Sequence, residues 1–193
     1  MTPIEITEEQ LTSVLHSVAP FTITLTPPGI TLYQIVSSLS KGAPLHILET
    51  GCVRDPTPTG MMTDGWSTFY FSKWVNENPG SKLTSVEINP INIEYGKLFI
   101  KRFNFSQNPE YITADSVAAI QGMAEHPDVF YLDSCDDLDH GLAEFQAALE
   151  HHPRLIIMDD LVSKAAKAVD FAKAQGIRHE FLARYTIFFP TDD

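Results

Sequence analysis

The feature that most constrains this chain is an alternation of short apolar runs with longer amphipathic stretches after residue 44. The apolar runs are residues 45–48, 83–86, 111–113, 129–132 and 155–158. The amphipathic stretches cover roughly residues 66–78, 91–103, 115–124, 139–151 and 162–175. Strands and helices that alternate in this way form a parallel sheet, because each crossover helix returns the chain to the end of the sheet where the previous strand began. The pattern predicts an α/β protein with a doubly wound, mostly parallel sheet and helices on both faces.

The two ends of the chain complete this organisation. Thr7 precedes apolar residues at helical spacing, and a second helix is expected from Ile30 to Lys41. The apolar segment 181–189 predicts one or two closing strands. With 193 residues and 44% hydrophobic residues, the chain has the size of one domain. We therefore expect a single domain over residues 1–193, with a helical N-terminal cap (1–44) and an α/β core (45–193).

Composition and charge disfavour several classes of partner. The chain has 13 Lys and Arg against 25 Asp and Glu, a net charge of −12, which opposes binding to nucleic acid phosphates. The longest uncharged stretch, residues 21–40, contains Pro27, Pro28 and Gly29, so no transmembrane helix is predicted. The first residues lack the order of a secretory signal, and two cysteines cannot form a disulfide framework. These features predict a cytoplasmic protein with no membrane or nucleic acid partner, and they leave the oligomeric state open.

Acidic residues follow all five predicted parallel strands. They are Glu49, Glu87, Asp115, Asp133 and the pair Asp159-Asp160. In a doubly wound sheet the carboxyl ends of the strands border the crevice where ligands bind. Carboxylates that converge there repel one another unless hydroxyl groups or amides donate hydrogen bonds to them, or a cation or metal ion neutralises their charge. The pattern therefore predicts a ligand at this edge.

The residue types indicate individual roles. Gly51, after the first strand, allows the backbone to approach a ligand closely because it has no side chain. Glu87 is placed to accept hydrogen bonds from the hydroxyls of a ribose. Asp115 and Ser116 are candidates for a contact with the amine of a base, and Asp115 is equally a candidate to cap the following helix. Both interpretations of Asp115 stay open.

Four segments carry a family resemblance: Glu49-Thr50-Gly51, Val86-Glu87-Ile88, Ala114-Asp115-Ser116 and Tyr131-Leu132-Asp133-Ser134. In this order at strand ends, they resemble the class I S-adenosylmethionine-dependent methyltransferases over about residues 45–160. The resemblance implies a Rossmann-like methyltransferase fold. It also implies that Glu49 and Gly51 line the methionine part of the cofactor, Glu87 the ribose and Asp115 the adenine. Asp133 would lie beside the methyl donor.

The loop after the first strand departs from the glycine-rich pattern of that family. Gly51 is followed by Cys52 and Val53, and Glu87 comes 36 residues later, against roughly 20 in the nucleotide-binding fingerprint. We interpret residues 64–68 as the delayed start of the first crossover helix, with Ser67 and Thr68 near the cofactor carboxylate. Arg54 is the other candidate for that carboxylate, because its guanidinium fork matches one.

A narrower resemblance concerns a metal ion. Small O-methyltransferases acting on catechol and caffeoyl-CoA substrates carry an acid after the fourth strand and an acid-amide pair after the fifth. The resemblance implies that Asp133, Asp159 and Asp160 bind Mg²⁺ or another divalent cation, which favours such oxygen ligands. Asp160 stands where the family usually has Asn. The alternative is a pair of aspartates that caps a helix.

The leading hypothesis is an S-adenosylmethionine-dependent methyltransferase that acts on a hydroxyl of a small molecule, mainly by aligning it with the methyl group. Asp133, helped by a metal ion or by His140, would assist deprotonation. The chain lacks the Asn/Asp-Pro-Pro-aromatic motif of base-directed enzymes after the fourth strand. Two alternatives remain. One is a metal-dependent glycosyltransferase that uses Asp137 and Asp139, and the other is a non-catalytic cofactor-binding domain, indicated by the unusual first loop.

Overall fold

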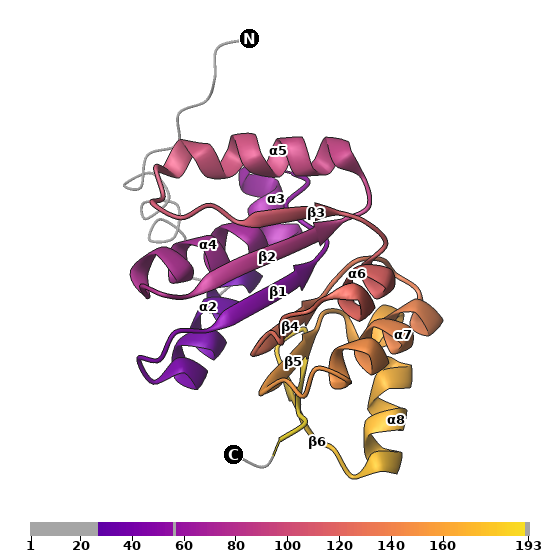
Figure 1. Cartoon of the computed structure of the whole chain (residues 1–193). Coiled ribbons are helices and arrows are strands. Elements are labelled where there is room, and N and C mark those ends of the chain that lie inside the picture. Colours follow the sequence, from indigo (N-terminus) through magenta and orange to yellow (C-terminus); the bar gives the residue numbers. More distant parts are fainter. Residues whose placement is uncertain (1–26, 56, 192–193) are drawn as a thin grey trace, which may run out of the picture.

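The computed structural model describes residues 27–55 and 57–191, which form a central sheet between two helical layers (Figure 1). The helix expected after Thr7 lies outside the described residues. Within the described ranges, no helix has the length and apolar character needed to cross a membrane.

The sheet has seven strands in the order β3-β2-β1-β4-β5-β7-β6. Their bounds are β1 His46–Thr50, β2 Lys82–Glu87, β3 Glu110–Thr113, β4 Val129–Leu132, β5 Leu155–Met158, β6 Arg178–Leu182 and β7 Tyr185–Phe189. The first five are parallel, whereas β7 runs antiparallel to both β5 and β6. The doubly wound sheet predicted from the sequence is therefore confirmed, and the closing segment forms two strands.

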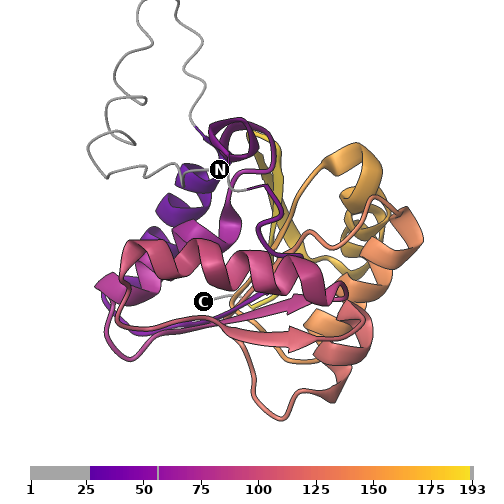
Figure 2. The same cartoon turned by 90° about the horizontal axis from the view of Figure 1, so that it is seen from above.

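Helices cover both faces of the sheet, as expected. They are α2 Pro28–Ser40, α3 Pro58–Thr63, α4 Ser67–Glu77, α5 Pro90–Ile100, α6 Ser116–Gly122, α7 Leu138–Leu149 and α8 Ala166–Gln175. A short 3-10 turn, η1 Lys101–Phe103, follows α5, and a π-helical turn, η2 Leu161–Ala165, precedes α8. Figure 2 shows α2, α4 and α5 on one side of the sheet and α6, α7 and α8 on the other.

Alternating side chains of the central strands supply both hydrophobic layers. In β4, Phe130 and Leu132 pack with α6, α7 and α8, whereas Val129 and Tyr131 pack with α2 and α4. All four side chains are buried, as expected for a strand covered on both faces. This core fixes the carboxyl ends of the strands at one edge of the sheet.

The sequence does not predict helix α3, because the segment between Arg54 and Gly65 has the composition of a loop. Thr57 caps this helix, since its hydroxyl accepts a hydrogen bond from Gly60 N at 3.2 Å. A Pro follows the cap at the first helical position. The long segment between β1 and α4 therefore contains one additional helix, α3.

Candidate functional site

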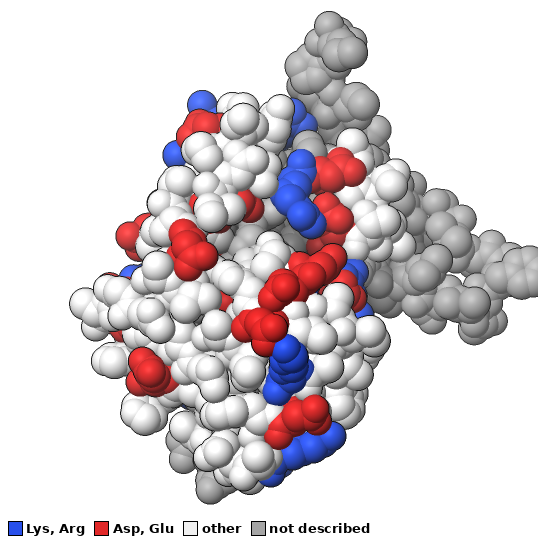
Figure 3. Space-filling model, turned by 90° about the vertical axis from the view of Figure 1, so that its right-hand side faces the viewer, with Lys and Arg blue, Asp and Glu red and all other residues white. Residues whose placement is uncertain are grey.

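The carboxyl ends of β1, β2 and β4 lie side by side. Thr50, the last residue of β1, is in register with Val86 on one side and Leu132 on the other. Figure 3 looks at the carboxyl edge of the sheet and shows Asp and Glu side chains with Lys and Arg among them. Acidic side chains therefore lie at this end of the sheet together with cations.

Glu49 is fully buried at the end of β1. Ser85 Oγ donates a hydrogen bond to its Oε1 at 2.7 Å, whereas Oε2 has no partner among the described residues. Burial raises the pKa of Glu49 to about 7, although the hydroxyls of Thr68, Ser85 and Ser67 oppose this shift. Glu49 therefore presents a buried carboxyl oxygen that lacks a donor within the described part of the chain.

Helix α4 begins at Ser67, within the segment that the sequence predicted for its start. Trp66 precedes it with a φ of 51°, a left-handed conformation that turns the chain into the helix. Ser67 and Thr68 are both buried, and the Thr68 hydroxyl accepts a hydrogen bond from Val53 N at 3.0 Å. Thr68 has no exposed surface, and its hydroxyl supports the first loop through Val53.

Gly51 is required by the neighbouring strand. Its φ is +80°, and a Cβ at this position would lie 2.6 Å from the carbonyl oxygen of Asp133. Its amide donates to Val86 O at 2.8 Å. Any side chain at residue 51 would therefore collide with the backbone that follows β4.

Glu87 ends β2 with its side chain mostly buried. Its Oε1 accepts a hydrogen bond from Asn89 N at 2.8 Å, and its Oε2 lies 3.9 Å from Cys52 Sγ. Asn89 in turn caps α5 by accepting from Ile91 N. One carboxyl oxygen thus holds the turn into α5, and the other faces the first loop.

Asp115 is exposed and caps α6, because Oδ1 accepts a hydrogen bond from Ala118 N at 3.0 Å. The capping interpretation is confirmed. Ser116, the first residue of α6, is buried, and its Oγ lies 2.9 Å from His140 Nε2.

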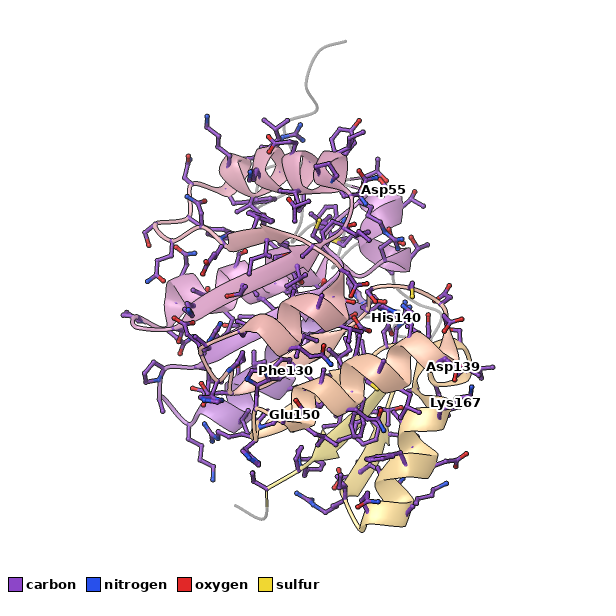
Figure 4. The ribbon with its side chains drawn as sticks, turned by 45° about the vertical axis from the view of Figure 1, so that its right-hand side comes forward. Asp55, Phe130, Asp139, His140, Glu150 and Lys167 are labelled. Atoms are coloured by element: carbon purple, nitrogen blue, oxygen red, sulfur yellow. The ribbon has the colours of Figure 1, made fainter. Side chains whose placement is uncertain are left out.

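His140 lies in the first turn of α7, where Figure 4 shows it near the carboxyl edge of the sheet. Its Nε2 is 3.8 Å from Glu144 Oε1, one helical turn later. Glu144 is buried, and burial raises the pKa of its carboxyl group. Among the described residues no hydrogen bond or ion pair joins His140 to Asp133, the group it was expected to assist.

Asp133 contacts a cation that the sequence interpretation did not include. The Lys164 ammonium hydrogen-bonds to Asp133 Oδ1 and lies 3.4 Å from Asp136 Oδ1. Tyr131 donates its hydroxyl to Asp133 Oδ2 at 3.1 Å. Burial alone would lower the pKa of Lys164, but the nearby carboxylates outweigh it and raise the pKa, so the ammonium stays charged.

Asp159 and Asp160 share a second cation, Arg184, which lies in the turn between β6 and β7. Arg184 Nε is 2.5 Å from Asp159 Oδ1, and its Nη2 is 2.9 Å from Asp160 Oδ2. The Arg184 Nη1 donates to Thr63 O at 2.8 Å. Within the part of the chain that the structure describes, the side chain of Asp160 makes no hydrogen bond that caps η2, so the pair is not a helix cap.

These contacts bear on the expected divalent ion. Within residues 27–55 and 57–191, no group of three or more His, Cys, Asp or Glu side chains could hold a metal ion. The three proposed ligands, Asp133, Asp159 and Asp160, are instead bonded to Lys164 and Arg184. The residues present do not fit a divalent ion, because the carboxylate oxygens that would bind it already contact the positively charged groups of Lys164 and Arg184.

Arg54, the second candidate for the cofactor carboxylate, is exposed. Its Nη2 lies 4.0 Å from Asp64 Oδ2, at the limit of an ion pair. It is therefore available to a ligand, although the structure brings it to no other predicted site residue among those described.

The Asp137-x-Asp139 pattern has structural roles. Asp137 Oδ1 accepts hydrogen bonds from the amides of Asp139 and His140 at 3.0 and 2.8 Å, which caps α7. Asp139 pairs with Lys167 on α8, and Figure 4 shows the two side chains together away from the strand ends. The geometry lends no support to a sugar-nucleotide site here.

Three site residues were missed from the sequence: Lys164, Arg184 and Glu144. Lys164 follows Asp160 by one helical turn, so its spacing carried a signal. Glu144 lies at the same interval after His140. The sequence carried no signal for Arg184, because this residue reaches the end of β5 only through the turn between β6 and β7.

No protein-family model matches this sequence, and no curated protein matches it. Solved structures do match. The cofactor-bound protein Rv0187 from MTB aligns with a TM-score of 0.66 at 14% identity, over 94% of this chain and 86% of that one. The O-methyltransferase from Bacillus cereus in complex with SAH aligns at 0.61 and 16% identity, over 93% and 86%. The SAH-bound Podospora anserina methyltransferase PaMTH1 aligns at 0.58 and 12% identity, over 92% and 100%. This chain therefore has the Rossmann-like fold of class I methyltransferases.

Proposed function

We propose that this protein is an S-adenosylmethionine-dependent methyltransferase that transfers a methyl group to a hydroxyl of a small molecule. The observation that carries the proposal is the buried carboxyl group of Glu49, whose Oε2 lacks a donor among the described residues beside the ends of β2 and β4. A buried carboxyl oxygen without a partner is costly, so a ligand that brings a hydrogen-bond donor would stabilise it. A cytoplasmic location and a small-molecule partner belong to the same proposal.

The cofactor residues follow the strand order. Glu49 would face the methionine part of the cofactor, and Glu87 the ribose hydroxyls. Asp115 and Ser116, at the start of α6, would border the adenine. S-adenosylmethionine supplies an activated methyl group on its sulfonium sulfur. Arg54 and Ser67 remain the candidates for its carboxylate, whereas the Thr68 hydroxyl is bonded to Val53 N and supports the loop.

The acceptor would lie at the ends of β4 and β5. Asp133 is the proposed proton acceptor beside the methyl donor, and Lys164 and Tyr131 hold its two oxygens in fixed directions. His140 is held by Ser116 and is proposed as a second group of the site. Fixed groups of this kind accelerate methyl transfer mainly by orienting the acceptor oxygen.

Calorimetry with S-adenosylhomocysteine tests the cofactor site. We expect Glu87→Ala to weaken binding by about 1–3 kcal/mol, the cost of losing hydrogen bonds to a charged group. Glu94→Ala is the matched control, because Glu94 is an exposed carboxylate on α5 that pairs only with Lys97 among the described residues. Equal affinities for both variants would remove Glu87 from the site, and no binding by the unmodified protein would contradict the proposed function.

A further inference from the structure

We infer that the Lys164 ammonium and the Arg184 guanidinium together take the place of a divalent ion at the ends of β4 and β5. The site would then hold its acceptor without a metal. This inference rests on the proposed function for the acceptor, but its charge arrangement stands on contacts that are independent of any cofactor.

Four acids surround the two cations, and each cation pairs with two of them. The cluster consists of Asp133, Asp136, Asp159, Asp160, Lys164 and Arg184. Two monovalent cations supply the same positive charge as one divalent ion. Each cation already contacts the carboxylate oxygens that a divalent ion would need, so the ion would have to displace Lys164 and Arg184 from them.

The backbone fixes Lys164 in this position. Asp160 has a φ of 43°, and the chain then makes the π-helical turn η2, in which Lys164 N donates to Asp160 O at 3.0 Å. Helix α7 approaches this turn so closely that a Cβ on Gly141 would lie 2.6 Å from Lys164 O. A left-handed residue other than glycine and a π turn both cost energy and recur at functional sites.

Three contacts of its guanidinium group fix Arg184 in position. Its planar fork contacts Asp159 and Asp160 with separate nitrogens, a geometry that an ammonium group cannot reproduce. The third nitrogen binds Thr63 O at the end of α3. The guanidinium thus joins the first loop to the end of β5, a connection that a metal ion held by aspartates alone would not make.

The charged cluster also bears on which hydroxyl-bearing acceptors the site would bind. An ammonium group has three N–H donors; that of Lys164 donates a hydrogen bond to Asp133 and forms an ion pair with Asp136 at 3.4 Å. Metal chelation selects two adjacent hydroxyls, whereas an ammonium donor binds one oxygen, so the inferred site does not require an acceptor with two adjacent hydroxyls.

Titration with Mn²⁺ tests the inference without any turnover. We expect no saturable binding to the unmodified protein. In Lys164→Gln and Arg184→Gln, the uncompensated aspartates should gain Mn²⁺ binding, and Mn²⁺ should raise the melting temperature of each variant. Lys97→Gln, which removes an exposed cation on α5, should show neither change. If a variant is unfolded alone, folding on addition of Mn²⁺ is the expected result.

Two results would overturn the inference. One is Mn²⁺ binding to the unmodified protein that Asp159→Asn abolishes. The other is the absence of any Mn²⁺ response in both variants. S-adenosylhomocysteine binding is measured in parallel after treatment with a chelator. Its absence would contradict the proposed function and leave the result of the Mn²⁺ titration standing.

Discussion

A single carboxyl group at the end of β1 shows how burial and function compete. Glu49 has one oxygen bonded to Ser85 and one without a partner among the described residues, and it is completely shielded from solvent. Its pKa of about 7 lies above the ordinary value of 4.5 for a glutamate, and burial is the main cause. Because the folded state binds the proton more tightly than the unfolded state, stability falls as the pH rises through this window.

The pH dependence of stability tests this environment. We expect the free energy of unfolding to decrease by about 3 kcal/mol between the unfolded and folded pKa values because of Glu49 alone. Glu49→Gln should remove that decrease, so the variant gains stability relative to the unmodified protein above pH 7. Denaturant unfolding at several pH values measures it, with Glu94→Gln as an exposed control. A difference between Glu49→Gln and the unmodified protein that stays constant with pH would contradict the assignment.

At the scale of elements, the contact between α7 and η2 holds Lys164 in place. A Cβ added to Gly141 would meet the backbone of Lys164, whereas a Cβ added to Gly122 on α6 would have no described atom within 4 Å. Gly141 lies in the first turn of α7 and Gly122 is the last residue of α6, and the two glycines differ in the space around them. They therefore separate helix propensity from packing.

We expect opposite effects from the same substitution. Gly122→Ala should stabilise the protein by roughly 0.5–1 kcal/mol, because Ala loses less backbone entropy on folding. Gly141→Ala should destabilise it by about 1–3 kcal/mol, because the added methyl group must displace η2. Thermal unfolding of both variants measures the difference. Stabilisation by Gly141→Ala would show that η2 is free to move away from α7.

At the scale of the whole molecule, one sheet joins both helical layers. The strands β1, β4 and β5 contribute side chains to the clusters on both faces, so the layers share a core. A ligand at the strand ends would therefore stabilise the molecule as one unit rather than one half of it.

Ligand-dependent melting tests this view. S-adenosylhomocysteine at about 100 times its dissociation constant should stabilise the fold by about 2.7 kcal/mol. For a domain of this size that corresponds to a rise in melting temperature of about 5–10 °C, followed by both fluorescence and circular dichroism. A uridine sugar nucleotide should produce no shift. The reverse pattern would favour the glycosyltransferase alternative.

The fold could be predicted because it depends on repeated local patterns. Each parallel strand is recognisable from its apolar run, and the end of β1 at Thr50 and the start of α4 at Ser67 follow from local residue types. Helix α3 and the π turn η2 could not be predicted, since they depend on the packing of a long loop and on contact with α7. A single sequence carries no signal for either contact.

The sequence predicted the acidic residues of the candidate site but not its two cations, Lys164 and Arg184. The strand-end position of Glu87 is evident from the sequence, and so is the close approach at Gly51. The cations were missed because Arg184 is distant in the chain and Lys164 lies in an irregular turn. Without these partners, Asp159 and Asp160 resemble a metal site. Charge balance depends on the complete three-dimensional neighbourhood, and strand ends show only part of it.

The backbone contact of Gly51 affects how mutational data on this protein should be interpreted. A residue beside a binding site is commonly assigned to the ligand when its substitution abolishes activity. Here, a methyl group at residue 51 would meet the carbonyl of Asp133 before it met any cofactor. Loss of activity in a Gly51 variant would therefore report the separation of β1 from β4, and soluble yield, rather than ligand affinity, would be the quantity that changes first.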